Sequence, residues 1–216
     1  MSAQVRSGLF IAEGTSDLPI AEIVESIFLD FDTMVHLSKP DFSLLTGVKK
    51  DVGSRVSAGV QLLRGTPLDL VVVHRDADNA GYQARRDEID KAVSEELMAE
   101  TVAVIPVRMT EAWLLLSEEE IRIVAGNPRS RKELSLPQIH EVERLADPKT
   151  TLQQCLLKAA DVTGRRRDAM AKRFNQHRRQ LLERLDRSGP VSALPSWRQL
   201  VRDIGATAER WKQVDR

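Results

Sequence analysis

The stretch Leu68-Asp-Leu-Val-Val-Val-His74 runs directly into Arg75-Asp-Ala-Asp-Asn-Ala-Gly81, and this junction decides the fold. Its first seven residues are mostly apolar and rich in β-branched valine, which predicts a buried strand. A second junction of this kind lies near the start of the chain, where Gly8-Leu-Phe-Ile-Ala12 is followed by Glu13-Gly-Thr-Ser-Asp17. A segment with helical spacing follows each acidic turn. Both junctions therefore predict a strand, a turn and a helix in succession.

Strands and helices alternate through the first half of the chain. Apolar runs at 33–37 and 101–107 predict two more strands, and helices are expected at 18–28, 53–63 and 80–98. Such alternation with fully apolar strands is typical of a parallel sheet that helices cover on both faces. We therefore expect an α/β fold with a four-stranded, mainly parallel sheet.

The second half of the chain is predicted to be helical. The polar, basic stretch Gly126–Leu136 predicts a loop, and we expect an α/β domain at 1–125 and a helical region at 126–216 that packs on it. The expected helices begin at residues 111, 118 and 148, followed by a long basic helix at Arg165–Arg187 and a last helix capped by Ser196.

Carboxylates follow both strands at the point where each strand ends. Parallel sheets bind ligands beyond the carboxyl ends of their strands, so Glu13, Asp76 and Asp78 would converge if the two strands are neighbours. In extended backbone the spacing of Asp76 and Asp78 places both side chains on one side. Gly14 would permit a tight turn and close approach of the backbone to a ligand. Carboxylate oxygens suit Mg²⁺ or Mn²⁺, which would neutralise a phosphate and activate a water.

Each of these acids also has an ordinary structural interpretation. Asp78 could cap the helix that follows it, and Asp17 or Ser16 could cap the first helix. Glu111, just after the fourth strand, could add an acid to the same edge or could be a first-turn acid favoured by the helix dipole. Glu13 has no comparable local duty, and the two motifs together favour a metal or phosphate site.

Glu-Gly-x-x-Asp after one strand and Asp-x-Asp-x-Ala-Gly-x-x-Ala after another resemble the TOPRIM domain over roughly residues 7–107. Topoisomerases, bacterial primases and the overcoming-lysogenization-defect nucleases share that domain. The resemblance implies that Glu13 performs general acid/base work or binds metal, and that Asp76 and Asp78 bind metal. Asp17 matches an acidic position that helps bind metal in the nuclease branch. The chain lacks the tyrosine-bearing domain of a topoisomerase and the zinc-binding cysteines of a primase.

The second half carries a looser resemblance. The segments Pro106–Leu115, Asp147-Pro-Lys149 and Leu194–Arg198 resemble an uncharacterised bacterial TOPRIM-like family, often encoded beside ATPases in phage-defence or mobile loci. We therefore expect a metal-dependent nuclease, with nucleic acid and an ATPase protein as partners. The alternatives are a catalytically silent TOPRIM-like module that binds an ATPase, and a hydrolase of small nucleotide phosphates.

Several cations could contact phosphate. Arg75 directly precedes the second acidic motif, with His74 before it, and each has an ordinary packing role as its alternative. The basic segment after residue 164, with Arg166, Lys172 and Arg173, could follow a nucleic-acid backbone, or could be a solvated helix face.

Composition sets further limits. Lysines and arginines equal the acids in number, at 32 each, so bulk charge does not indicate a nucleic-acid partner. Cys155 is the single cysteine, which excludes an intramolecular disulfide and predicts a buried structural thiol. No apolar run approaches the length of a membrane span, so a cytoplasmic protein is expected. No phosphate-loop, dinucleotide or hydrolase-elbow motif is present.

Overall fold

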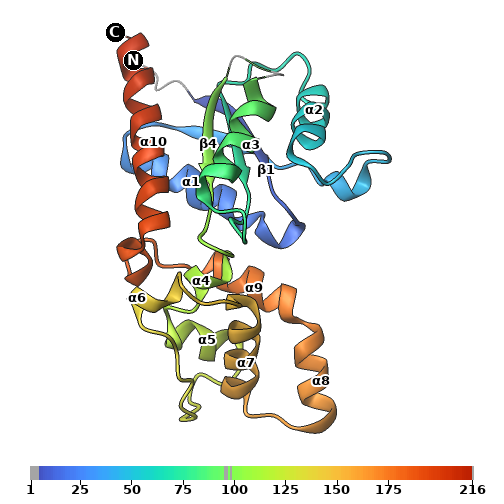
Figure 1. The fold of residues 1–216 in the computed structure, drawn as a ribbon, viewed down its shortest axis with the longest axis vertical. Helices are drawn as coiled ribbons and strands as arrows, with labels where there is room; N and C mark the ends of the chain where they lie inside the picture. Colours follow the sequence, from blue (N-terminus) through green and yellow to red (C-terminus); the bar gives the residue numbers. More distant parts are fainter. Residues whose placement is uncertain (1–4, 95–96, 98, 216) are drawn as a thin grey trace. The chain divides into compact units, whose positions relative to one another are not determined.

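A computed structural model describes residues 5–94, 97 and 99–215 of the chain. Within them, one parallel sheet has the strand order β2-β1-β3-β4 (Figure 1). Its strands are β1 (Arg6–Ile11), β2 (Val35–Ser38), β3 (Leu70–His74) and β4 (Glu100–Val104). The expected α/β class with a four-stranded parallel sheet and a helical part is confirmed.

The chain forms two compact units, each built from segments that are distant in sequence. The sheet unit contains the described residues of Met1–Arg75, Ala80–Ile105 and Arg198–Arg216, and the helical unit contains Asp76–Asn79 and Pro106–Trp197. These ranges differ from a division after residue 125, because residues 76–79 and 106–125 belong to the helical unit and most of the last helix belongs to the sheet unit.

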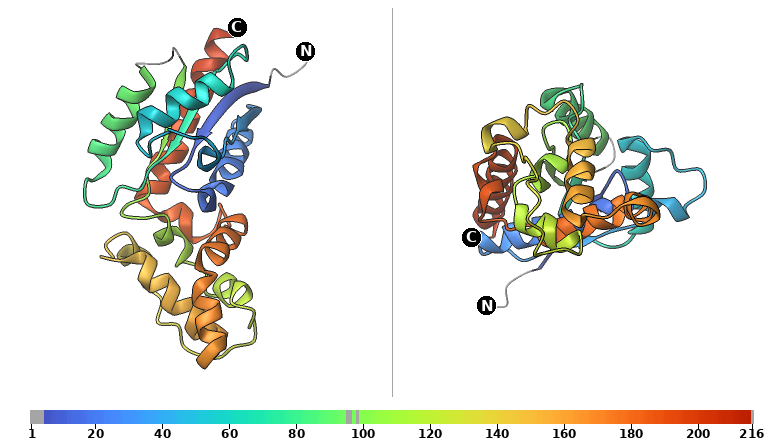
Figure 2. Two further views of the ribbon diagram at one scale, coloured as in Figure 1. Left: turned by 90° about the vertical axis from the view of Figure 1, so that its right-hand side faces the viewer. Right: turned by 90° about the horizontal axis from the view of Figure 1, so that it is seen from below.

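Helices cover both faces of the sheet in the sheet unit (Figure 2). Helix α1 (Pro19–Asp30) lies on one face, with most of α10 (Pro195–Val214) beside it, and the Phe28 and Trp211 rings stack at 5.6 Å. Helices α2 (Val52–Leu62) and α3 (Tyr82–Ser94) pack together on the other face. This division follows from right-handed crossovers between parallel strands.

The core of the sheet unit is centred on β1 and β3. The two strands are parallel neighbours, with Gly8 opposite Leu70 and Ile11 opposite Val73. All five residues of β3 are buried, as the valine-rich run predicts for a strand covered on both faces. The predicted convergence of the acidic turns requires that their two strands are neighbours, and β1 and β3 are neighbours.

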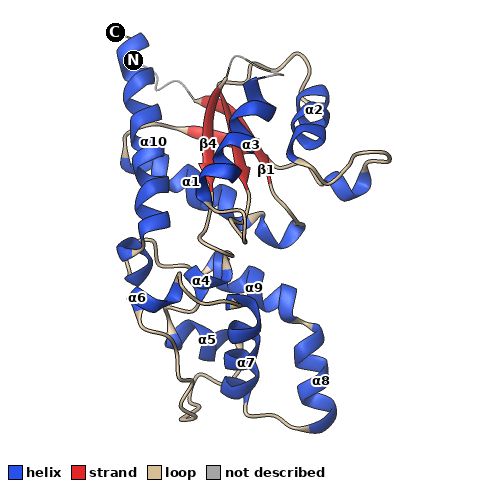
Figure 3. Cartoon of the chain, in the orientation of Figure 1, coloured by secondary structure: helices blue, strands red, loops and turns tan. Residues whose placement is uncertain are grey.

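The helical unit packs around Trp113. Its indole ring meets that of Trp197 edge-on at 5.1 Å, and its Nε1 donates a hydrogen bond to Ser196 Oγ over 2.9 Å. The described helices of this unit are α4 (Glu111–Leu114), α5 (Glu118–Val124), α6 (Ile139–Val142), α7 (Pro148–Ala160), α8 (Gly164–Lys172), α9 (Phe174–Glu183) and the 3₁₀ turn η3 (Pro190–Ala193) (Figure 3).

Two expectations about helices were wrong. The long basic helix is two helices, because the Arg173 amide bonds back only three residues to the Met170 carbonyl and closes α8 there. The last helix begins at Pro195, so Ser196 lies inside it and its hydroxyl bonds to Trp113 and Glu143 instead of capping. The predicted loop at Gly126–Leu136 is confirmed, whereas residues 95, 96 and 98 of the helix expected at 80–98 lie outside the described residues.

Two smaller expectations can also be compared with the fold. Cys155 is 4% exposed, as expected of a structural thiol, and burial raises the pKa of its sulfur. Among the described residues, no helix is both long enough and apolar enough to cross a membrane.

Candidate functional site

Glu13 follows β1 and is held by an arginine that follows β3. Arg75 Nη1 donates to Glu13 Oε1 over 2.5 Å, and Arg75 Nε lies 3.6 Å from Glu88 Oε2 on α3. Burial acts to lower the pKa of Arg75, but the two glutamates together raise it above its ordinary value. Arg75, expected as a phosphate contact, thus bridges two carboxylates of its own unit.

The backbone that carries Glu13 is fixed by Arg55 of α2. The Arg55 Nη1 group donates to the carbonyl oxygens of Ala12 and Glu13, the latter over 3.1 Å. This contact joins α2 to the end of β1. Sequence reasoning missed Arg55, which occupies a helix with no motif around it.

Asp17 is buried and forms a turn with Gly14. Its Oδ2 accepts a hydrogen bond from the Gly14 amide over 3.2 Å and lies 3.8 Å from Nδ1 of His74, which is 1% exposed. Asp17 belongs to the 3₁₀ turn η1 (Thr15–Asp17) and does not cap α1, whose N-cap is Leu18. Gly14 has extended backbone, with φ at −152°, so the turn does not require glycine there.

In the helical unit, the strand-like pairing continues past β3 and positions Asp76. The amides of Ala77 and Asp78 donate to the carbonyls of Pro106 and Arg108. Asp76 Oδ1 accepts hydrogen bonds from both the amide and the hydroxyl of Thr110, each over 3.0 Å. Thr110, directly before Glu111, therefore contributes to the orientation of the Asp76 carboxylate through both its amide and its hydroxyl.

Asp78 does not share the extended backbone expected from the Asp-x-Asp spacing. Its φ is +46°, in the left-handed region that Asp and Asn tolerate better than most residues, and its side chain is exposed. Asp78 therefore is not placed with Asp76 by strand alternation, and it does not cap α3, which begins at Tyr82. Its neighbour Asn79 accepts a hydrogen bond from Arg108 over 2.8 Å.

Glu111 lies at the first position of α4 and is 4% exposed. Arg178 of α9 donates from Nε to Glu111 Oε1 over 2.9 Å, and that arginine is 6% exposed. Burial raises the pKa of Glu111, the Arg178 charge opposes the rise, and the Asp76 charge adds to it. Asp76, Thr110, Glu111 and Arg178 thus form one polar group inside the helical unit.

A sequence signal for Arg178 existed. The apolar residues of α9 are Phe174, Leu181 and Leu182, and Arg178 lies on the same stripe, four residues after the first and three before the second. A cation on a buried stripe indicates a buried acid beside it, because burying an unpaired charge costs free energy. Arg178 therefore differs from the exposed cations of the basic stretch Arg165–Arg187, within which it lies.

The cations of α8 and the residue after it are exposed, whereas Arg178 is buried. Helix α8 has no buried residue, and Arg166, Lys172 and Arg173 are exposed. These three form no ion pair with any described carboxylate. The structure therefore places them on a surface, in separate positions from the buried Glu111–Arg178 pair.

The acids are of the right chemical kind for a hard cation but do not form a ready cage. Among the described residues, no group of three or more His, Cys, Asp or Glu side chains is arranged to hold a metal ion. Glu13 and Glu111 are each engaged by an arginine, and Asp17 and Asp76 accept backbone or hydroxyl hydrogen bonds. Comparisons with known protein families, with characterised proteins and with solved structures each gave no match to this chain.

Proposed function

We propose that this chain is a divalent-metal-dependent phosphodiesterase of the TOPRIM type that cleaves nucleic acid. The observation that carries the proposal is the parallel pairing of β1 with β3, with Ile11 opposite Val73. Glu13 comes two residues after Ile11, and Asp76 three residues after Val73, so both acidic turns leave one edge of the sheet. Open α/β sheets bind their ligands at that edge.

The proposed roles follow the carboxylates. Asp76, Asp78, Asp17 and Glu111 would bind Mg²⁺ or Mn²⁺, because oxygen-only donor sets suit these ions. A bound ion would offset charge on the phosphate oxygens and lower the pKa of a water. Glu13 would accept the proton of the attacking water or contribute to a second ion. Thr110 would keep the Asp76 carboxylate in one orientation for this purpose.

Metal binding at the proposed site depends on two arginines that now hold the glutamates. Arg75 holds Glu13 and Arg178 holds Glu111, so each glutamate can bind a cation only after its guanidinium moves or shares the carboxylate. Arg75 is the one that can move at lower cost, since its side chain is 24% exposed whereas that of Arg178 is 7% exposed. Once released, Arg75 would be placed at the end of β3 to bind a substrate phosphate, as expected from the sequence.

We assign substrate binding to exposed cations of α8 and to Arg173, the residue that follows this helix. Arg166, Lys172 and Arg173 would contact the phosphate backbone, an interaction that releases counterions and supplies affinity without sequence preference. The chain is neutral overall, so this local excess of positive charge is what would attract a polyanion.

The test is cleavage by the purified chain. Single- and double-stranded DNA and RNA are incubated with Mn²⁺, Mg²⁺ or EDTA, for the native chain and for Asp76→Asn and Glu13→Gln. We expect metal-dependent cleavage that falls at least about 100-fold in both variants, as loss of a group acting on the transition state implies. Asp87→Asn, an exposed acid of α3 outside the site, is the control and should cleave normally. Undiminished cleavage by either site variant would refute the assignment.

A second candidate is a catalytically silent TOPRIM-like module that binds an ATPase. The observation that favours it is the neutralisation of both glutamates by the chain's own arginines, which is a stable arrangement without metal. In that case the isolated chain does not cleave under any metal condition. Cleavage that starts only when an ATPase is added, and stops in Asp76→Asn, supports the phosphodiesterase as the effector of an ATPase-coupled phage-defence system. An ATPase complex whose activity is identical in Asp76→Asn supports the silent module.

A further inference from the structure

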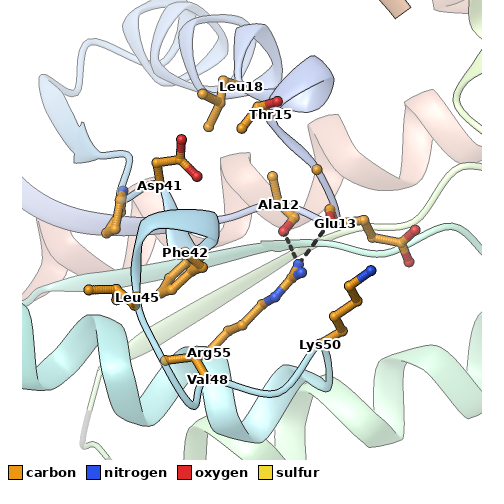
Figure 4. Close-up of a pocket in the computed structure, with 12 residues that line it drawn as sticks. Ala12, Glu13, Thr15, Leu18, Asp41, Phe42, Leu45, Val48, Lys50 and Arg55 are labelled. Carbon is orange, nitrogen blue, oxygen red and sulfur yellow. Dashed lines mark hydrogen bonds between the residues drawn. The ribbon is translucent and has the colours of Figure 1, made fainter.

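A pocket of about 530 Å³ opens beside the end of β1, in the sheet unit (Figure 4). One wall is the Ala12–Thr15 turn and the start of α1, and the other is the segment between β2 and α2. The volume lies within the range of about 300–1,000 Å³ that small-molecule sites occupy. Glu13 contributes to the lining, so the pocket adjoins the proposed catalytic residue.

The pocket combines an apolar wall with an aromatic ring. Leu18, Leu45 and Val48 line it together with Phe42. Phe42 is half-buried, whereas six of the nine aromatic side chains of this aromatic-poor chain are buried in the two cores. The Arg55 guanidinium carbon lies 5.9 Å from the centroid of the Phe42 ring. A planar, partly apolar group is the kind of ligand that such a wall accommodates.

The same pocket holds two cations and two acids, the acids being Glu13 and Asp41. Arg55 and Lys50 line it, and neither forms an ion pair with a described carboxylate. Among the described residues, the hydrogen-bond partners of Arg55 are the two backbone carbonyls, and its buried Nε has no acceptor there. Glu13, by contrast, already has its counter-charge in Arg75. Figure 4 shows Lys50 near Glu13, with Asp41 and Thr15 farther from this lysine.

We propose that this pocket binds one nucleoside monophosphate unit, with the base against Phe42 and Leu45 and the phosphate toward Lys50. A nucleotide has the three properties that the lining selects: a planar ring, a negative phosphate, and hydroxyl and amino donors for Asp41 and Thr15. The proposal rests on the proposed function, since it makes this unit the nucleotide next to the phosphate that is cut, either at the end of a strand or released from one.

The test measures binding without catalysis. Isothermal titration calorimetry in EDTA compares AMP, UMP, a 5′-phosphorylated dinucleotide, adenosine and inorganic phosphate on the full chain. We expect AMP or the dinucleotide to bind, with adenosine and phosphate at least about tenfold weaker, because the pocket contacts both parts of the ligand. Preference for the dinucleotide assigns the pocket to a strand end, and equal binding assigns it to a free mononucleotide.

Two matched pairs of variants locate the ligand. Phe42→Ala should weaken nucleotide binding about tenfold through lost stacking, and Leu44→Ala, an 80% exposed neighbour that does not line the pocket, should not. Lys50→Ala should weaken AMP binding more than adenosine binding, and Lys49→Ala should leave both unchanged. Should Phe42→Ala misfold, the lysine pair decides, because both lysines are exposed.

Three outcomes of the binding experiments would overturn the proposal. These are no nucleotide binding at millimolar concentration, inorganic phosphate binding as tightly as AMP, and equal effects within both matched pairs. The outcome is separable from that of the proposed function. Cleavage that is lost in Glu13→Gln but normal in Phe42→Ala supports the catalytic assignment and refutes nucleotide binding in the pocket. Nucleotide binding by a chain that does not cleave supports the pocket proposal and refutes the catalytic assignment.

Discussion

Arg178 and Glu111 are 67 residues apart in the chain and form a buried ion pair, with Nε to Oε1 at 2.9 Å and side chains 7% and 5% exposed. Each charge would be costly to bury alone, because burial removes its hydration and no partner would compensate for the loss. The pair thus ties α9 to α4 inside the helical unit and lies beside Asp76. Variants of these two residues can be tested by their stability alone, without an activity assay.

Replacing Arg178 should destabilise the helical unit. Arg178→Met leaves Glu111 buried without its partner, and we expect the free energy of unfolding to fall by about 3 kcal/mol. The matched control is Arg179→Met, whose native pair with Glu183 is exposed and worth less than about 1 kcal/mol. The double variant Arg178→Met/Glu111→Leu should recover most of the loss. Urea unfolding followed by circular dichroism measures the native chain and the three variants, and equal midpoints for the two single variants would contradict this account.

Stability should depend on the pH through Glu111. Burial raises the pKa of this carboxyl above its ordinary value of 4.5. A group whose pKa is raised by folding favours the folded state fully below the unfolded pKa, and loses that contribution as the pH rises through the folded value. The native chain should therefore lose stability relative to Glu111→Gln as the pH increases above 4.5. Unfolding midpoints of both proteins between pH 4 and 8 test this, and a constant difference would show that Glu111 does not titrate differently on folding.

The contact between α2 and β1 is set by a glycine. A Cβ on Gly59 would lie 2.6 Å from Leu9 Cδ2, in a core where Leu9 is fully buried, so Gly59→Ala should cost about 1–3 kcal/mol by overpacking. A Cβ on Gly53, in the first turn of the same helix, meets only Asp51 Oδ1 at 3.7 Å. Gly53→Ala should therefore stabilise the chain by up to about 1 kcal/mol through helix propensity. Thermal unfolding would disprove the assigned packing if both variants shifted the midpoint in the same direction.

Thr110 should act as a positioning residue for Asp76. Thr110→Val removes the hydroxyl hydrogen bond to Asp76 Oδ1 but keeps the amide bond and the shape of the side chain. We expect kcat for nucleic-acid cleavage to fall roughly tenfold, as a poorly oriented carboxylate implies, while KM stays within about twofold. Thr110→Ser restores the hydroxyl and should recover most of the rate. A loss that Ser does not rescue would indicate a packing role for the residue.

Exposed cations near α8 should account for the salt dependence of nucleic-acid binding. Each phosphate contact contributes roughly 0.7–0.9 to the slope of log K against log salt concentration. Lys172→Ala and Arg173→Ala should each reduce the slope by about that amount. The controls are Lys212→Ala and Arg179→Ala, cations that already pair with Glu209 and Glu183. Fluorescence anisotropy with a labelled oligonucleotide at 50–300 mM salt measures the slopes, and equal reductions in test and control variants would reject α8 as the binding surface.

The strands of the sheet were predictable because their signals are local. Val71, Val72 and Val73 are β-branched and consecutive, which suits a strand buried on both faces and few other structures. The acidic turns were likewise visible, since each follows its strand directly in the chain. Cys155 was predictable as a buried thiol because the apolar residues around it repeat with helical spacing.

The surroundings of the acids were less predictable. Asp78 was expected to share the face of Asp76, but its backbone is left-handed and its amide donates to the carbonyl of Arg108, a residue of another segment. Arg75 was expected to meet phosphate and is found between Glu13 and Glu88. The register of β3 with β1 brings Arg75 to Glu13, and α3 supplies Glu88.

By itself the sequence determined the local elements: where backbone extends, where it turns, and which turns carry carboxylates. These follow from side-chain shape and from apolar spacing over a few residues. Only the tertiary structure decided which charges neutralise one another, as with Glu13 and Arg75 or Glu111 and Arg178. The reason is that a buried carboxylate takes the cation that folding brings within about 3 Å, and its position in the chain carries no information about that distance.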